Sequence, residues 1–308
     1  MAEILVTGAA GFLGRHLCTA LIDGAHRVLA AAAAGSEGMP KDAVPVVVDA
    51  CNSEGFARAV RCLRPQLVVH AAFRNRKEAN QTDLEYLRDL QAVDIPLFEA
   101  CALTGASLLS VGSSAVYGSA EGRDLIDEDC PIRPVSVYGL AKAMQEMTAQ
   151  YEVIARALPL VIVRLFNLIG PGQSTGMVVP DWVSRAVHIA RGAEPVLRVA
   201  NRAAARDFVD VRDAAQAIRL LVEDFRPGTV INVASGTTVS LTEISDALIA
   251  LCPRPFAVQE TAPVLSATDV RIQCGDYARL KKGWGWQPQI TWRQSLSDVW
   301  QEHWARGK

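Results

Sequence analysis

The first fourteen residues constrain the fold more than any other part of the chain. Ile4-Leu5-Val6 is a short apolar run, and Thr7-Gly8-Ala9-Ala10-Gly11-Phe12-Leu13-Gly14 follows it directly. An apolar helical pattern then continues through Leu17 and Leu21. Glycines in this setting allow a tight turn and a close approach of the backbone to a pyrophosphate, which lies at the positive end of the following helix. The pattern predicts a strand, a glycine turn and a helix that together bind a dinucleotide, with contacts from Gly8, Gly11, Phe12, Leu13, Gly14 and Arg15.

The second expected strand, residues 27–31, bears on which dinucleotide binds. NAD-binding proteins usually carry an acidic residue at the end of this strand, where it binds the ribose 2′-hydroxyl. Residues 31–36 here are Ala-Ala-Ala-Ala-Gly-Ser. Because no carboxylate repels a 2′-phosphate and Arg15 could pair with one, NADPH is favoured. The alternative is that Arg15 is solvated and Glu37 reaches the ribose, so NADH stays possible.

Strands and helices alternate over the next part of the chain. Residues 44–48 and 67–72 should be the third and fourth strands, separated by a helix over 53–62. A long amphipathic helix is expected over 83–104, which Pro96 should bend or break. This alternation predicts an α/β fold with a doubly wound parallel sheet of the Rossmann type, whose ligands gather at the carboxyl ends of the strands.

The ends of the third and fourth strands supply further candidates for cofactor binding. Asp49, with Ala50 beside it, could accept a hydrogen bond from an adenine amino group or could cap the next helix. Ala71 and Ala72 are small enough to leave room for the cofactor. His70 falls inside an apolar run and is expected to be a core histidine with satisfied hydrogen bonds.

A phenol and an ammonium stand four residues apart in the segment 136–142. At that spacing Tyr138 and Lys142 lie on one helix face, and a fixed positive charge lowers the pKa of a phenol from its usual value of about 10. Residues 111–118 should form a fifth strand that ends in hydroxylated residues, so Ser113 could bond a carbonyl or an alcohol. Ser113, Tyr138 and Lys142 are the candidate catalytic set, although a Tyr-x-x-x-Lys pair by itself is more often a surface or packing pair.

Composition argues against several classes of partner. The net charge of −2 and the absence of Lys/Arg clusters give no footprint for nucleic acid or anionic lipid. The seven cysteines show no C-x-x-C spacing and are expected to be reduced, buried thiols instead of metal ligands. No run of membrane-spanning length and no signal sequence is recognisable. We expect a cytoplasmic protein without a metal.

The pattern changes after residue 165. Residues 160–164 should be the sixth strand, and the Gly/Pro-rich segment 165–173 suggests that the chain leaves the sheet. Shorter elements follow, with helices expected over 181–191, 212–223, 241–251 and 291–304 and strands over 195–199 and 230–233. We therefore expect an NAD(P)-binding Rossmann domain in residues 1–165, with returning segments near 206–235, and a smaller C-terminal α/β substrate-binding lobe in residues 166–308.

These motifs together resemble the extended short-chain dehydrogenase/reductase family, also called the NAD-dependent epimerase/dehydratase family. The glycine turn, Ser113-Ser114-x-Val116-Tyr117-Gly118, Tyr138-x-x-x-Lys142, Phe166-Asn167 and Arg206-Asp207-Phe208 occur in the family's order over nearly the whole chain. Residues 166–173, 176–181 and 206–213 look most like the subgroup of GDP-6-deoxy-4-keto-mannose reductases. The resemblance implies an NAD(P)-dependent oxidoreductase that acts on a nucleotide-diphosphate sugar.

The resemblance also implies a role for each site residue. Tyr138 would donate a proton, Ser113 would bond the carbonyl oxygen, and Lys142 would bond the nicotinamide ribose and lower the tyrosine pKa. The second lobe would hold the sugar, the base and the diphosphate, the last with guanidinium groups. The substrate-binding positions that it implies are Ser114, Asn167, Val178, Val179, Arg206 and Arg271.

Departures from the family pattern narrow the chemistry. Members that dehydrate sugars carry an Asp-Glu pair directly after the catalytic hydroxyl, where this chain has Ser114-Ala115. Members that epimerise C3 and C5 carry a nearby cysteine that this chain lacks. The expectation is reduction of the C4 ketone of a nucleotide-diphosphate 4-keto-6-deoxy sugar, with GDP-4-keto-6-deoxy-mannose preferred. A dTDP-4-keto-6-deoxy-sugar reductase, a UDP-sugar C4 epimerase and a non-enzymatic NADP sensor are the alternatives.

Relatives in this family commonly form homodimers. The long helix after the fourth strand and the helix that carries Tyr138 pack against the same pair of a second subunit in a four-helix bundle. Leu84, Leu87, Leu97 and Met147 could form that face here, or could belong to an intramolecular core. We expect a homodimer.

Overall fold

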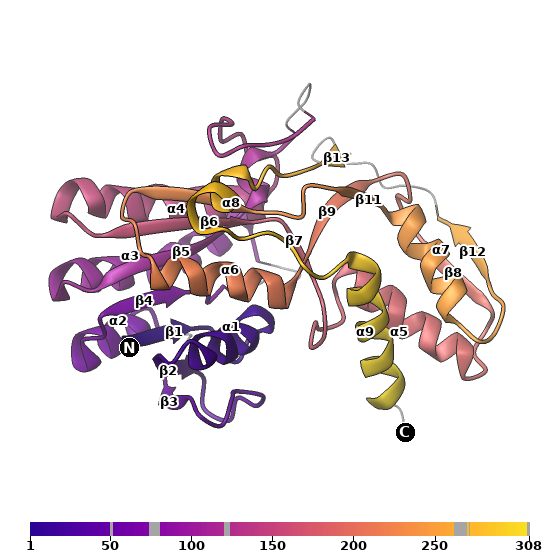
Figure 1. Cartoon of the computed structure of the whole chain (residues 1–308), viewed down its shortest axis with the longest axis horizontal. Helices are drawn as coiled ribbons and strands as arrows, with labels where there is room; N and C mark the ends of the chain where they lie inside the picture. The colour runs from indigo at the N-terminus through magenta and orange to yellow at the C-terminus, as the bar shows by residue number, and fades with distance from the viewer. Residues whose placement is uncertain (50–51, 74–80, 120–123, 262–269, 271, 307–308) are drawn as a thin grey trace.

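A seven-stranded parallel sheet forms the larger part of the computed structural model, which describes residues 1–49, 52–73, 81–119, 124–261, 270 and 272–306 (Figure 1). The strand order is β10-β6-β5-β4-β1-β2-β3. The strands are β1 (Glu3–Thr7), β2 (Arg27–Ala32), β3 (Val44–Val47), β4 (Leu67–His70), β5 (Ser107–Ser113), β6 (Leu160–Leu165) and β10 (Thr229–Val233). The order reverses between β1 and β4, which opens a ligand-binding crevice at the carboxyl ends of these strands. The predicted Rossmann-type fold is confirmed.

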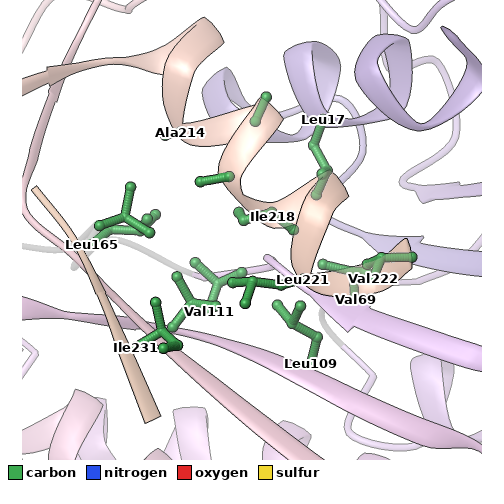
Figure 2. Packing of buried hydrophobic residues seen from close by; sticks show 14 of the residues in the cluster. Leu17, Val69, Leu109, Val111, Leu165, Ala214, Ile218, Leu221, Val222 and Ile231 are labelled. Carbon is green, nitrogen blue, oxygen red and sulfur yellow. The ribbon is translucent and has the colours of Figure 1, made fainter. Parts of the chain in front are cut away.

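Helices cover both faces of this sheet because successive strand side chains point to opposite sides. Ile4 and Val6 pack with α1 (Phe12–Asp23) and α6 (Val211–Glu223), whereas Leu5 packs on the other face. Figure 2 shows the first core, where Ile218 and Leu221 of α6 lie against strand residues such as Val111. On the opposite face lie α2 (Gly55–Leu63), α3 (Asp83–Thr104) and α4 (Val137–Arg156). The sheet is therefore doubly wound, as predicted.

A smaller lobe begins where β6 runs into β7 (Figure 1). Its core is built around Trp182, Ile244 and Leu296, which come from three helices far apart in the sequence. Its strands form a sheet of order β11-β9-β13, with β7 paired to β9, and a separate β12-β8 pair. The elements of this lobe are β7 (Asn167–Ile169), α5 (Val178–Ala190), β8 (Val196–Val199), β9 (Ala205–Asp210), β11 (Thr238–Ser240), α7 (Leu241–Leu251), β12 (Ala257–Glu260), β13 (Ile272–Gln273) and α9 (Trp292–Arg306). The helix α8 (Ala278–Trp284) returns to the large sheet and packs against β10 and α6.

Most expected elements lie within three residues of the observed bounds. The fifth strand, expected over residues 111–118, is instead β5 at Ser107–Ser113, because Ser113 caps a 3₁₀ turn over residues 114–117. The break that was one alternative at Pro96 is absent, because α3 continues through this residue and packs against α2 and α4. Five of the six described cysteines are buried as expected, whereas Cys62 near the end of α2 is exposed. No helix in the described ranges is long and apolar enough to cross a membrane. The division into a cofactor part, residues 1–165 with segments near 206–235, and a substrate part, residues 166–308, stays a proposal.

Candidate active site

Ser113 and Tyr138 meet at the carboxyl end of β5. Ser113 is the last residue of β5, and its Oγ accepts a hydrogen bond from Ala115 N at 3.2 Å, which starts the 3₁₀ turn η1 (Ser114–Tyr117). Tyr138 lies in the first turn of α4, whose N-terminus is capped by Ser136 through a 3.1 Å bond from Gly139 N. The Tyr138 and Ser113 side chains are hydrogen-bonded to each other. Strand end and helix start therefore bring a hydroxyl and a phenol together.

Lys142 lies one turn further along α4 and is buried. Its Nζ donates to Val111 O at 2.9 Å and to Gln145 Oε1 at 3.0 Å. The Phe73 ring lies 4.2 Å from the same nitrogen and 5.2 Å, centroid to centroid, from the Tyr138 ring. Desolvation lowers the pKa of Lys142 to about 8, and the negative charge of Asp94 opposes that shift. The ammonium thus loses its proton more readily than an exposed lysine does.

The pKa of Tyr138 differs from the expectation based on spacing. Desolvation raises the pKa of the phenol, and the hydrogen bond with Ser113 lowers it, with a net upward shift. The expectation that Lys142 lowers this pKa does not describe the structure, because the Lys142 ammonium is bonded to Val111 and Gln145. Without ligands, the phenol is protonated at neutral pH and can act as a proton donor.

The glycine turn lies beside these residues and has no room for larger side chains. Gly8 has φ 69°, and a Cβ there would lie 2.7 Å from the Cα of Ala72 at the end of β4. A Cβ on Gly14 would lie 2.1 Å from Gly8 O. The helix α1 starts at Phe12 and Leu13 with no side chain capping its N-terminus, so its first N–H groups can bind an anion. The turn therefore fits a pyrophosphate group.

Arg15 reaches from this turn toward the segment after β2. Its Nη2 donates to Gly172 O at 2.9 Å, and its Cδ would lie 2.9 Å from a Cβ on Gly38. Glu37 is exposed. The guanidinium is thus held near the position where the adenosine ribose of a bound dinucleotide would be expected.

The other cofactor candidates have different placements. Ala71 and Ala72 are half-buried at the carboxyl end of β4, as a cofactor contact requires. Asp49 is exposed and does not cap α2, whose N-cap is Glu54, so the capping alternative was wrong. Ala50 lies outside the described residues.

The substrate candidates are spread over η1 and the smaller lobe. The buried Ser114 Oγ donates to Gln273 Oε1 at 3.1 Å, and Gln273 Nε2 donates back to Ser114 O at 2.9 Å. Asn167 Nδ2 donates to Asp207 O at 3.3 Å, and the half-buried Arg206 donates to Ala205 O at 3.0 Å. Ser114 is therefore already hydrogen-bonded to Gln273 of β13, a residue that no motif in the sequence singled out.

The two valines expected at the base pocket face different ways. Val178 is 46 % exposed at the start of α5, whereas Val179 is 3 % exposed and packs in the core of the smaller lobe. The Val179 side chain is thus not placed to touch a ligand, because its helix turns it inward. Arg271 lies outside the described residues.

A buried ion pair holds the surroundings of the site together. Arg164 of β6 pairs with Glu146 of α4, and its Nη1 also donates to Tyr117 Oη at 2.9 Å and to Glu128 O at 3.0 Å. The Tyr117 hydroxyl donates in turn to Asn232 of β10 at 2.7 Å. These contacts join η1, α4, β6 and β10, and so fix the strand end that carries Ser113 against the helix that carries Tyr138.

Comparisons with known proteins agree with this architecture. Residues 4–234 match the profile of the NAD dependent epimerase/dehydratase family. GDP-6-deoxy-D-mannose reductase from Pseudomonas aeruginosa is 30 % identical over an aligned length of 308 residues, and the alignment covers 96 % of this chain and 95 % of that protein. UDP-glucose 4-epimerase from Azospirillum brasilense is 31 % identical over 263 residues, 79 % of this chain and 75 % of that protein. The solved structure of RMD from Pseudomonas aeruginosa complexed with NADPH is similar with a TM-score of 0.85 and 26 % identity, over 99 % of this chain and 100 % of that chain.

Proposed function

Because this chain belongs to the NAD dependent epimerase/dehydratase family, we propose that it uses NADPH to reduce the C4 ketone of a nucleotide-diphosphate 4-keto-6-deoxy sugar. The observation that carries this proposal is the meeting of Ser113, Tyr138 and Lys142 beside the glycine turn. The similarity to GDP-6-deoxy-D-mannose reductase over 96 % of the chain supports GDP as the nucleotide. We also propose that the protein acts in the cytoplasm.

The chemistry needs one proton donor and one group that orients the ketone. When bound, NADPH supplies the hydride that the C4 carbon accepts. The Ser113 hydroxyl donates a hydrogen bond to the C4 oxygen, and Tyr138 transfers its proton to that oxygen as negative charge develops on it. With the cofactor bound, the Lys142 ammonium would hold the nicotinamide ribose by donating hydrogen bonds to it. Each of these electrostatic interactions is stronger in a site from which water is excluded.

The nucleotide can be identified by thermal stability. In the presence of NADPH, we expect GDP to raise the melting temperature more than UDP, dTDP or CDP, since a ligand that binds only the folded state stabilises it, by about 2.7 kcal/mol at a hundredfold excess over Kd. Arg206→Ala should lose that response because the guanidinium would hold the diphosphate. Arg226→Ala is the matched control, as that exposed arginine pairs with Asp224.

Other outcomes of this experiment point to other members of the family. A larger response to dTDP would change the substrate while leaving the reductase chemistry in place. A larger response to UDP, with NAD retained through purification and redox-neutral interconversion of UDP-glucose and UDP-galactose, would favour the epimerase suggested by the relative from Azospirillum brasilense. Cofactor binding without turnover of any keto sugar would favour a sensor.

Arg15 is expected to set the preference for NADPH over NADH. Because its guanidinium is held between Gly172 and the segment near Gly38, it can bond a 2′-phosphate there. Arg15→Ala should raise the Kd for NADPH by about 10- to 100-fold, the loss of a charge-assisted hydrogen bond, with little change for NADH. Fluorescence titration with both cofactors measures this. An equal loss for both would assign Arg15 to the packing of the turn.

We propose that α3 and α4 also form a homodimer interface. Leu84 is 79 % exposed on α3, and Met147, Tyr151 and Ile154 of α4 are 64 %, 61 % and 87 % exposed. For Leu87 and Leu97 the other of the two expected roles is the observed one, since both lie in the subunit's own core. Light scattering at micromolar concentration should give twice the subunit mass, and Ile154→Glu should shift it toward the monomer. A monomeric wild-type protein would rule the interface out.

A further inference from the structure

A chain of buried polar side chains runs from the end of β1 to Lys142. Thr7 Oγ1 lies 2.8 Å from His70 Nδ1, and His70 Nε2 lies 3.0 Å from Asp94 Oδ1. Asp94 Oδ2 accepts from Gln145 Nε2 at 3.2 Å, and Gln145 Oε1 accepts from Lys142 Nζ at 3.0 Å. This series of hydrogen bonds thus connects β1, β4, α3 and α4, and all five side chains in it are buried.

The donors and acceptors in this series of hydrogen bonds can be assigned from the groups at its two ends, Ala72 N and the Gln145 amide. Ala72 N donates to Thr7 Oγ1 at 3.2 Å, and the Thr7 hydroxyl can donate its own proton to His70 Nδ1. With Nδ1 accepting, His70 donates from Nε2 to Asp94 Oδ1. From the other side the Gln145 amide donates to the second oxygen of Asp94. Both Asp94 oxygens therefore accept hydrogen bonds, one from His70 and one from the Gln145 amide.

The positive charge that can balance the Asp94 carboxylate is the Lys142 ammonium. The titratable groups around Lys142 in the described structure are Asp94 from α3, Tyr138 from its own helix and His70 of β4 behind Asp94. Glu146, also on α4, is bound to Arg164 of β6. A buried ammonium without a counter-charge gives up its proton, and a buried carboxylate without one is equally unfavourable. Asp94 and Lys142 therefore balance each other through the Gln145 amide.

We propose that Asp94 is a positioning residue that acts through Gln145 to keep Lys142 charged and fixed in place. The His70 and Thr7 end of the chain ties this carboxylate to the strand that leads into the glycine turn, so cofactor binding and the lysine share one support. The inference rests on the proposed function in one respect, that Lys142 binds the nicotinamide ribose.

The test measures NADPH binding between pH 6 and 9, which needs no sugar substrate. Loss of the Asp94 charge lowers the pKa of Lys142, so the ammonium is lost at lower pH. In Asp94→Asn, the pH at which NADPH affinity declines should fall by about one unit, with affinity near wild type at pH 6. Asp89→Asn, at a half-buried position on the same helix, should keep the wild-type profile. The pH at which kcat declines on the alkaline side should also fall in Asp94→Asn.

Two further variants separate charge from structure. Asp94→Asn combined with Gln145→Glu places a carboxylate against Lys142 and should restore the wild-type profile, which a purely structural defect would not allow. If Asp94→Asn does not fold, Gln145→Leu breaks the same chain and should weaken NADPH binding across the range. An unshifted profile in Asp94→Asn, or unchanged binding in Gln145→Leu, would overturn the inference. A shifted binding profile without turnover of any keto sugar would overturn the proposed function alone.

Discussion

Replacing Tyr138 with Phe is expected to lower kcat by roughly 10²–10⁴-fold, the usual contribution of a general acid. The variant removes only the hydroxyl that meets Ser113, and the ring keeps its contact with Phe73. Desolvation raises the pKa of this phenol, so the wild-type group is protonated and ready to donate at neutral pH. Steady-state NADPH oxidation with the 4-keto sugar as substrate gives the measurement.

NADPH binding should be close to wild type in the same variant, because Lys142 and the glycine turn are unchanged. Tyr151→Phe is the matched control, since Tyr151 lies on the same helix and is 61 % exposed. It should keep full turnover. Normal turnover in Tyr138→Phe would falsify the assignment of the proton donor, whereas loss of NADPH binding would give Tyr138 a role in the cofactor site.

Replacing Glu146 with Ala should cost about 3–5 kcal/mol in the free energy of unfolding, the usual loss when one partner of a buried ion pair is removed. Glu146 and Arg164 are 2 % and 4 % exposed, so the guanidinium left behind has no route to water. It would still contact Tyr117 and Glu128 O, which do not neutralise its charge. Urea unfolding followed by circular dichroism measures the loss.

A control for this effect is Glu194→Ala, which breaks an exposed i,i+4 pair with Arg198. Its effect on stability should be far smaller, because water and salt already screen that pair. A second expectation concerns activity: any folded Glu146→Ala protein should lose turnover, since Arg164 and Glu146 join the elements that carry Ser113 and Tyr138. Stability close to wild type would mean that the Arg164 charge finds another partner.

The sequence predicted the parts of the site that depend on local geometry. The glycine turn, the strand that ends in Ser113 and the helix that carries Tyr138 are each set by a few neighbouring residues, and the fold was confirmed along with these elements. Long-range partners were not predictable. Asp94 and Lys142 come from different helices, and no spacing in the sequence connects them. Gln273 meets Ser114 only because β13 returns to β9.

Apolar residues were also ambiguous in the sequence. Leu84 and Leu97 both fit an amphipathic helix, but the structure exposes the first and buries the second. Helical periodicity does not distinguish a face that meets the subunit's own core from one that meets solvent or a partner. Val179 was expected beside a ligand because of the family resemblance, but the helix turns its side chain into the core while its neighbour Val178 is exposed.

The large sheet is completed only after much of the smaller lobe has been synthesised. β10 pairs with β6 along the whole of its length, although β7, α5, β8, β9 and α6 separate the two strands in the chain. Until residues 229–233 leave the ribosome, β6 is an open edge whose free N–H and C=O groups can pair with another chain. A fragment ending at residue 165 would retain Ser113, Tyr138 and Lys142 but would carry this open edge permanently. Such a fragment is expected to aggregate through this edge.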